Sequence, residues 1–211
     1  MLPLIAAALL FFATLTTLVE LSPRVRAWDE SIAQWAADDA SPWATDLARW
    51  ATHLADTNVY VALTTVVIVA LLVARRSRLA GFVASVAIGQ WILSNSIKHL
   101  VGRGRPQVYR LIAAAGSSFP SGHATAAASL YLALALVAAA LWPRLSQVAL
   151  IAAAIAIAIV VAASRVLVGV HWTTDVLAGL ALGWAWCLLL AWVFRMPVLI
   201  TASTETAMVQ K

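Results

Sequence analysis

The stretch that decides the fold is Ala162-Ala-Ser-Arg-Val-Leu-Val-Gly-Val-His-Trp-Thr-Thr-Asp175, a short polar segment between two long apolar runs. The runs, Leu145 to Ser164 and Val176 to Phe194, contain no charged residue over about the 20 residues that a helix needs to cross a bilayer. The segment itself carries an arginine, a histidine and an aspartate. Ionisable residues at the edge of a membrane span are costly enough to indicate a functional site. A hydrophilic loop among lipid headgroups is the alternative for this stretch taken alone.

The histidine and the aspartate of this segment have the spacing of a pair that works together. His171 and Asp175 are four residues apart. If a helix begins just before Asp175, its carboxylate lies about one turn from the imidazole and can hold one ring nitrogen, while the other nitrogen faces outward. This is the geometry of an activated nucleophile or base.

The whole chain has the composition of a membrane protein. Hydrophobic residues make up 63% of its 211 residues and charged residues 11%, and a water-soluble fold has no place for that much apolar surface. Four further uncharged stretches of about spanning length precede the two above: Met1 to Val19, Thr57 to Ala74, Leu79 to Ile97 and Leu111 to Pro143. We therefore predict an all-α polytopic membrane protein with six transmembrane helices. The first is expected to be an uncleaved span, because no lysine or arginine precedes its apolar run as in a secretory signal.

The connection between the first two spans has a different pattern, from Trp28 to Leu54. Tryptophan and leucine recur there at intervals of three, four or seven residues, while Asp29 and other acidic residues occupy other faces. Ser41-Pro42 divides the segment, because proline suits the first turn of a new helix and serine can cap it. We predict two short amphipathic helices lying in the membrane interface, with a connection from Pro23 before them. A helical hairpin packed on the core is the alternative.

Positive charges set the expected orientation. The basic loop Arg75-Arg76-Ser77-Arg78 is too short for anything but a turn and should be cytoplasmic. Counting spans from this loop places the N terminus inside. The long first connection, the loop from Lys98 to Phe119 and the loop that contains His171 then lie outside. Basic residues then number eight outside and six inside, or five and six once Lys98, Arg105 and Arg165 are assigned to ligand binding. We divide the single domain into a first span at 1–20, interfacial helices at 28–54, a five-span core at 57–196 and a cytoplasmic tail at 197–211.

Basic residues concentrate where acidic residues are rare. Seven of the nine acidic residues lie at or before Asp56, whereas ten lysines and arginines lie between Arg75 and Arg195. This imbalance favours an anionic ligand. Three groups of reactive residues fall on one predicted membrane face: Lys98 with Arg105-Pro106, Ser121-Gly122-His123, and Arg165 with His171 and Asp175.

Together these residues match the needs of phosphoryl transfer. Fixed positive charges stabilise the negative charge on the phosphoryl group during its transfer. Lys98, Arg105 and Arg165 supply three cations, two of them guanidinium groups suited to paired oxygens. Ser121 and Gly122, at a helix start, offer unpaired backbone N–H groups. Of the two histidines, one can attack phosphorus while the other protonates the departing oxygen.

A metal site is not expected among these residues. Two-metal phosphatases need several oxygen ligands, and these segments contain a single carboxylate. Two histidines and an aspartate could ligate iron, but the three neighbouring cations would oppose the binding of a metal ion. No metal and no cofactor are therefore predicted.

The ordered motifs resemble those of a known family. Lys98-x6-Arg105-Pro106, Pro120-Ser121-Gly122-His123 and Ser164-Arg165-x5-His171-x3-Asp175 look like the three signature motifs of the type-2 phosphatidic acid phosphatase family, with no motif position substituted. The resemblance implies metal-independent dephosphorylation of a lipid phosphate or diphosphate through a phosphohistidine intermediate. It also implies the roles of the motif residues: His171 as nucleophile, Asp175 as its orienting partner, His123 as acid for the leaving group, and Lys98, Arg105, Ser121, Gly122 and Arg165 as phosphate-binding residues.

The short membrane-embedded form is similar to bacterial lipid phosphatases that act on undecaprenyl diphosphate, phosphatidylglycerophosphate or phosphatidic acid. The resemblance thus implies a multi-pass protein of the bacterial plasma membrane, with an extracytoplasmic site and a membrane lipid as substrate. No nucleic-acid or protein partner is predicted. The alternatives are phosphotransfer to another acceptor, lipid binding or transport without catalysis, and halide oxidation with bound vanadate.

Other polar residues near the motifs have simpler interpretations. We expect His53 to be a surface residue and His99 an interfacial residue at a helix end. Arg103 and Arg110 either anchor the protein among headgroups or contact a second phosphate. Trp172 either packs against the lipid or marks the interface.

Overall fold

The structure, a computed structural model, describes residues 1–197 of the chain. Within this range the chain forms eight α-helices and one short 3-10 helix, and no strand. In chain order these are α1 (Leu2–Leu21), α2 (Pro23–Asp38), α3 (Pro42–Thr52), η1 (His53–Ala55), α4 (Thr57–Val73), α5 (Ser77–Val101), α6 (Gly122–Leu141), α7 (Gln147–Leu167) and α8 (Thr173–Val193). The predicted all-α fold is confirmed. The predicted tail lies outside the described residues, apart from its first position.

Six helices account for the predicted membrane spans. Five of them, α1 and α5 to α8, are long and apolar enough to cross a membrane on their own. The sixth, α4, has 17 residues and follows the helical stretch Pro42–Ala55 with a bend of 43°. The two parts together pass the same test as one broken span.

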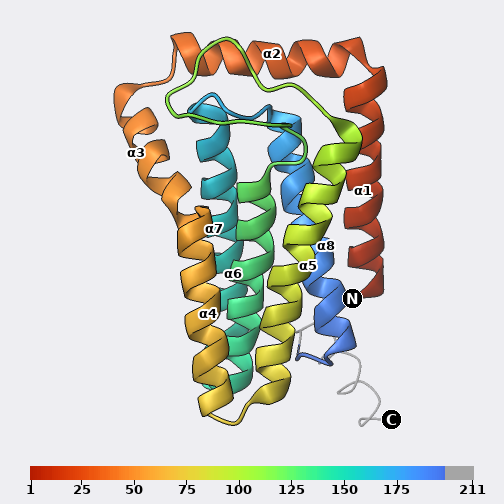
Figure 1. The fold of residues 1–211 in the computed structure, drawn as a ribbon, viewed down its shortest axis with the longest axis vertical. Coiled ribbons are helices and arrows are strands. Elements are labelled where there is room, and N and C mark those ends of the chain that lie inside the picture. The colour runs from red at the N-terminus through yellow and green to blue at the C-terminus, as the bar shows by residue number, and fades with distance from the viewer. Residues whose placement is uncertain (198–211) are drawn as a thin grey trace, which may run out of the picture.

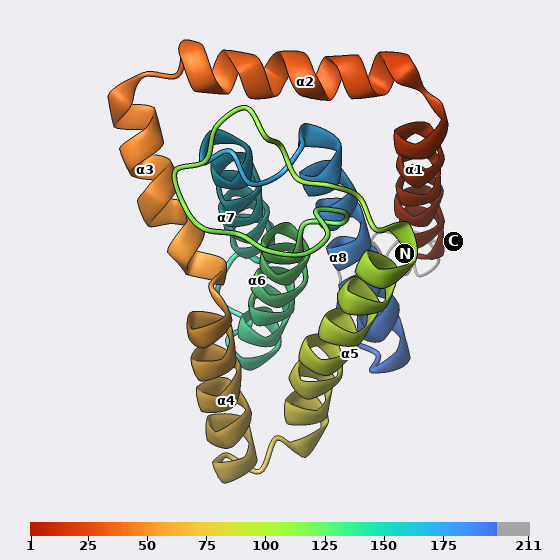
Figure 2. The same ribbon diagram turned by 45° about the horizontal axis from the view of Figure 1, so that its top comes forward.

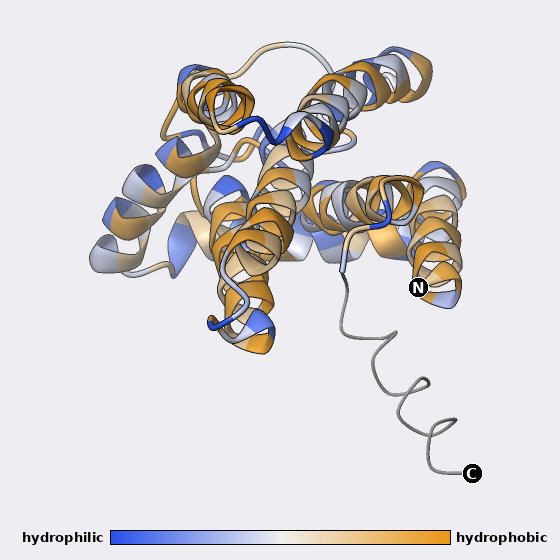
Figure 3. Ribbon diagram, turned by 90° about the horizontal axis from the view of Figure 1, so that it is seen from below, coloured by the Kyte–Doolittle hydropathy of each residue, from blue (hydrophilic) through white to orange (hydrophobic). Residues whose placement is uncertain are grey.

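The long helices run side by side, and α2 lies across one end of them (Figure 1). We call this the α2 end. The connections α5–α6 and α7–α8 lie there, beneath α2, whereas the N terminus and the tight α4–α5 turn lie at the opposite end. Seen from that opposite end, the helices are hydrophobic over most of their length (Figure 3), as a bundle surrounded by lipid requires.

The start of α2 differs from the prediction. The segment from Pro23 was expected to be a connection, but it is the first turn of a 16-residue helix. The Ser22 hydroxyl accepts a hydrogen bond from the Val25 N–H at 3.4 Å, and proline occupies the first helical position. This is the same serine-proline signal that was used to place the start of α3 at Pro42, and it applies equally here.

The start of α6 agrees with the prediction. Within the uncharged stretch from Leu111 to Pro143, Ser121 and Gly122 were expected at a helix start, and α6 begins at Gly122. Gly102, with a φ of 65°, ends α5 in the left-handed conformation that glycine adopts readily. Leu111 then donates its N–H to the Val168 carbonyl at 3.0 Å and packs in an apolar cluster around Val168. The apolar residues before Gly122 therefore cover the α7–α8 connection and do not cross the membrane.

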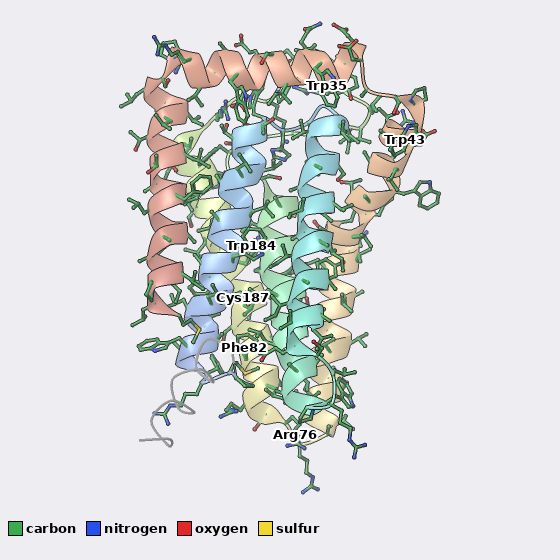
Figure 4. All side chains as sticks on the ribbon, turned by 180° about the vertical axis from the view of Figure 1, so that it is seen from behind. Trp35, Trp43, Arg76, Phe82, Trp184 and Cys187 are labelled. Carbon is green, nitrogen blue, oxygen red and sulfur yellow. The ribbon has the colours of Figure 1, made fainter. Side chains whose placement is uncertain are left out.

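Close packing of α6 and α8 brings two parts of the predicted site together. A Cβ atom at Gly179 would lie 2.7 Å from the Ser121 carbonyl oxygen, and one at Gly183 would lie 2.5 Å from that of Thr125. Glycine at these two positions therefore lets α8 approach α6 closely. Deeper in the bundle the free thiol of Cys187 is buried beside Phe82 (Figure 4).

One face of α3 is apolar and points away from the bundle. Trp43, Leu47 and Trp50 are largely exposed, and Trp43 projects outward from the other helices (Figure 4). Exposed tryptophans of this kind are typical of helices at the headgroup level. The interfacial location of α2 and α3 stays a prediction.

Candidate active site

The structure brings all eight predicted site residues to the α2 end. Figure 2 shows the two connections that meet there. The residues come from the last turn of α5 (Lys98), the α5–α6 connection (Arg105), the start of α6 (Ser121, Gly122, His123), the last turn of α7 (Arg165), the α7–α8 connection (His171) and the first turn of α8 (Asp175). Helix termini and short connections, not helix interiors, thus supply the predicted chemistry.

His171 is held between a carboxylate and a guanidinium group. Its Nδ1 lies 3.4 Å from Asp175 Oδ2, and its Nε2 lies 3.1 Å from Arg105 Nη1. A guanidinium can only donate, so Nε2 must be the acceptor and the proton of the neutral ring sits on Nδ1. The Nδ1–Asp175 contact is long, as such contacts often are before a ligand binds.

The protonation state agrees with this hydrogen-bond pattern. Burial lowers the pKa of His171 to about 4, with help from the positive charges of Arg105 and Arg165 and against the opposing effect of Asp175. The ring is therefore neutral at physiological pH. Its Nε2 lone pair faces the cations, where an anion would bind.

Loop carbonyl groups position the cations of the first motif. Arg105 donates to the Gly116 carbonyl oxygen at 3.1 Å and to that of Val170 at 2.8 Å. The Lys98 ammonium donates to the Ser117 carbonyl oxygen at 2.9 Å. The positive charges of Lys98, Arg105 and Arg165 act on one another, so the three predicted cations belong to one end of the bundle.

Arg165 is buried at the end of α7. It is 5% exposed and donates through Nη1 to the Thr52 hydroxyl, but its buried Nε has no partner among residues 1–197. Ser117 Oγ and Thr173 Oγ1, in the two connections of the α2 end, are buried and equally unpaired within that range. Buried polar atoms are normally hydrogen-bonded, so these three are exceptions.

The start of α6 offers fewer donors than predicted. The Ser121 N–H was expected to be free, but it donates to the Asp175 carbonyl oxygen at 3.0 Å. Its hydroxyl caps the helix by accepting from Ala124 N–H at 3.5 Å. Gly122 occupies the first helical position, where N–H groups have no partner within the helix. A Cβ atom at Gly122 would lie 3.8 Å from Lys98 Cε, an ordinary contact distance, so this N–H stands beside the lysine of the first motif.

His123 contacts a carboxylate that sequence reasoning missed. Its Nε2 lies 3.0 Å from Asp56 Oδ1, and Asp56 Oδ2 lies 2.6 Å from His53 Nδ1. The His53 side chain is exposed, as predicted. Asp56 stands at the N-cap of α4, and an acid directly before an apolar run was the available signal. Because a carboxylate accepts, Nε2 of His123 carries a proton in this arrangement.

Two other residues differ from their predicted surroundings. Asp29 was assigned to a polar face of α2, but it is 1% exposed. Arg103 was expected among headgroups or against a second phosphate, but its guanidinium lies between Asp29 and Asp175. Trp172 stacks on this guanidinium at 5.4 Å and donates its indole N–H to the Gly104 carbonyl oxygen at 2.8 Å. Arg103 therefore pairs with carboxylates inside the protein, while the interfacial role of Trp172 stays a prediction.

A cavity extends from the site along the bundle between α4 and α5. Its volume is about 460 Å³, and Lys98, Gly122 and His123 line one part of it. The remaining wall is largely apolar and includes Ile88 and Trp91. Figure 2 shows α4 and α5 diverging toward the α2 end in front of α6. A ligand with a phosphate at the cation cluster can therefore extend an apolar tail between these helices.

Comparison with known proteins identifies the family. The PAP2 superfamily matches residues 78–198, more than half of the chain. A lipid A 1-phosphatase of Rhizobium etli is 35% identical over 128 residues, which make up 56% of this chain and 51% of that protein. Phosphatidylglycerophosphatase B of Bacillus subtilis is 39% identical over 94 residues, or 44% of this chain and 46% of that protein. The chain thus spans about half the length of the curated relatives it matches.

A solved structure extends the similarity to nearly the whole chain. The crystal structure of a transmembrane PAP2 type phosphatidylglycerolphosphate phosphatase from Bacillus subtilis has a TM-score of 0.85 and 28% sequence identity. The match covers 90% of this chain and 96% of that one. The resemblance inferred from the three motifs is therefore confirmed, and the chain belongs to the PAP2 superfamily.

Proposed function

We propose that this protein hydrolyses a lipid phosphate or diphosphate without a metal ion, through a phosphohistidine formed on His171. The observation that carries the proposal is the state of His171, a buried neutral ring whose Nε2 accepts from Arg105 while Nδ1 faces Asp175. A nitrogen lone pair beside a cluster of cations is what attack on a phosphate ester requires.

The first step forms the covalent intermediate. Nε2 of His171 attacks phosphorus, and the bond between phosphorus and the lipid oxygen breaks. The imidazolium form of His123 gives one proton to that oxygen and becomes a neutral ring, so the lipid leaves as an alcohol, or as a monophosphate when the substrate is a diphosphate. Asp175 holds the Nδ1 proton and stabilises the positive charge that the ring gains.

The second step restores the enzyme. A water molecule attacks phosphorus of the phosphohistidine and gives a proton to His123, while the phosphorus–nitrogen bond breaks. Inorganic phosphate leaves, and both imidazoles return to their starting states. Lys98, Arg105 and Arg165 stabilise the charge on phosphate oxygens in both steps.

The cavity between α4 and α5 supports a lipid as the substrate. It begins at Lys98 and His123 and continues between helices that bear exposed apolar residues. A phosphate ester with a hydrocarbon chain fits both parts at once. The relatives support the same class, since their names describe a lipid A 1-phosphatase and a phosphatidylglycerophosphatase.

We propose that the site faces the extracytoplasmic side of a bacterial plasma membrane. The support is the basic turn Arg75 to Arg78, which lies at the end opposite the site. Lysine and arginine in short loops favour the cytoplasmic side.

A substrate panel tests the proposed function. Detergent-purified protein in excess chelator is expected to release inorganic phosphate from at least one of undecaprenyl diphosphate, phosphatidylglycerophosphate, phosphatidic acid and lipid A bearing a 1-phosphate. No release from any of them by folded, monodisperse protein contradicts the proposal. Product analysis with an added lipid alcohol separates hydrolysis from phosphotransfer, and an assay with vanadate and halide tests oxidation.

Filling the cavity is expected to act on lipid substrates selectively. Ala126 of α6 lines the cavity and is 7% exposed. Ala126→Leu should lower kcat/KM for the best lipid of the panel by about tenfold, because the added methyl groups occupy space that the tail needs. The ratio of lipid to p-nitrophenyl phosphate turnover is the measurement.

The matched control for this prediction is Ala138→Leu. Ala138 belongs to the same helix and lines a second cavity of about 550 Å³, near Trp142 at the opposite end. It should leave the ratio unchanged. If both substrates lose activity in parallel in Ala126→Leu, the cavity does not hold the tail.

A further inference from the structure

A buried cluster of charges joins α2 to the start of α8. Arg103 donates through Nη1 to Asp175 Oδ1 at 2.6 Å and through Nη2 to Asp29 Oδ2 at 2.7 Å. Both carboxylate side chains are fully buried, and that of Arg103 is 11% exposed. Because a guanidinium is a planar fork, a single arginine can hold two carboxylates in fixed positions.

Asp29 also binds the first turn of α8 directly. Its Oδ1 accepts from the Thr174 N–H at 3.0 Å, and its Oδ2 accepts from the Thr174 hydroxyl at 2.5 Å. The same hydroxyl accepts from Arg103 Nη1 at 2.7 Å. A carboxylate on α2 therefore caps a helix that begins more than a hundred residues later in the chain. Arg103, Thr174 and the two carboxylates form one closed network.

This network determines which oxygen of Asp175 faces His171. Asp175 Oδ2 accepts from the Trp172 N–H at 3.0 Å and lies toward His171 Nδ1. Oδ1, the other oxygen, is held by Arg103. With both oxygens bound, the carboxylate cannot rotate away from the imidazole. The orientation of the nucleophile thus depends on a contact that begins at Asp29.

We propose that Arg103 and Asp29 are positioning residues for the reaction, and that α2 takes part in catalysis through this bridge. The inference rests on the function proposed above. Burying three charges between two helices has a large desolvation cost, and apolar side chains of similar size often stabilise a fold as well or better. Their direct contact with the partner of the nucleophile accounts for their presence.

The test compares four variants with the wild-type protein on the best substrate of the panel. Arg103→Met is expected to lower kcat by about 10- to 100-fold, the usual cost of removing a group that orients a reacting side chain. KM should stay within about twofold, because the phosphate-binding cations remain. Inhibition by vanadate, which mimics the transferring phosphoryl group, should weaken together with kcat. Arg103→Lys should recover part of the rate, because it restores one charge but not the fork.

Asp29 provides the second arm of the test. Asp29→Asn should lower kcat by about threefold to tenfold with KM again preserved, because its effect on Asp175 passes through Arg103. The double variant Asp29→Asn/Arg103→Met should be no slower than Arg103→Met alone. It should also melt at a higher temperature than Arg103→Met, because it no longer buries an unpaired carboxylate at position 29. Should Arg103→Met fail to fold, Asp29→Asn and Arg103→Lys decide the question.

The matched control is Arg26→Met on the same helix. Among residues 1–197, the Arg26 guanidinium donates only to the carbonyl oxygens of Val19 and Glu20, near the α1–α2 junction. The Arg26→Met variant should keep the wild-type kcat and the wild-type inhibition by vanadate. Wild-type kcat in folded Arg103→Met, or losses that multiply in the double variant, overturns the inference. The inference is also overturned if, in all variants, kcat falls in proportion to the loss of melting temperature. Inactive wild-type protein contradicts the proposed function instead.

Discussion

Replacing His171 with alanine is expected to lower kcat on the lipid substrate by at least about 10⁴-fold, because no other group can take the place of the attacking nitrogen. The His171 ring is buried and its Nε2 contacts Arg105, whereas Nε2 of His123 contacts Asp56. Phosphate release from detergent-purified protein is the measurement. Labelling with a ³²P-phosphate substrate should trap an acid-labile phosphoenzyme in the wild type and none in the variant.

His99→Ala is the matched control for this result. His99 is exposed at the end of α5, next to Lys98 but outside the hydrogen-bond network of the site. It should keep both activity and labelling. A His171→Ala protein that retains its label, or more than a tenth of the wild-type rate, places the nucleophile on another residue.

Replacing His123 with alanine is expected to produce a loss that depends on the leaving group. A lipid alcohol is a poor leaving group and needs a proton as the bond breaks, so kcat should fall by about 10²- to 10⁴-fold. p-Nitrophenol leaves without protonation, so the loss on p-nitrophenyl phosphate should be about tenfold or less. The ratio of the two losses is the measurement that identifies His123 as the acid.

The control for this variant concerns the carboxylate that His123 contacts. In Asp56→Asn the hydrogen bond to Nε2 remains possible, but the negative charge that favours the imidazolium is removed. The lipid should again be affected more than the activated ester, by a smaller factor than in His123→Ala. Equal losses on both substrates in His123→Ala would assign this histidine to phosphate binding instead of proton transfer.

Local patterns in the sequence contain most of the information on the fold. Uncharged stretches of spanning length predicted the six long helices, and Ser41-Pro42 predicted the start of α3. These features depend on residues near one another in the chain. The uncharged stretch from Leu111 is longer than α6, because hydrophobicity alone does not distinguish a lipid-facing helix from a loop that packs on Val168.

The contacts of the site were predictable only where a motif contains both partners. His171 and Asp175 belong to one helix start, so their spacing alone indicated the pair. Asp29 and Asp56 were missed because their partners lie far along the chain, and an amphipathic pattern assigns an acidic residue to water by default. Only the placement of α2 over α8, and of η1 beside α6, converts these two acids into buried or site-facing groups.

The cavity between α4 and α5 gives the proposed function a kinetic consequence. A lipid that enters it from the bilayer keeps its tail in the hydrocarbon, so enzyme and substrate meet by diffusion in two dimensions. The effective substrate concentration is then the mole fraction of the phosphorylated lipid in the surrounding bilayer or micelle, and not its amount per volume of solution. Adding inert lipid or detergent at constant total substrate slows such an enzyme by dilution within the surface.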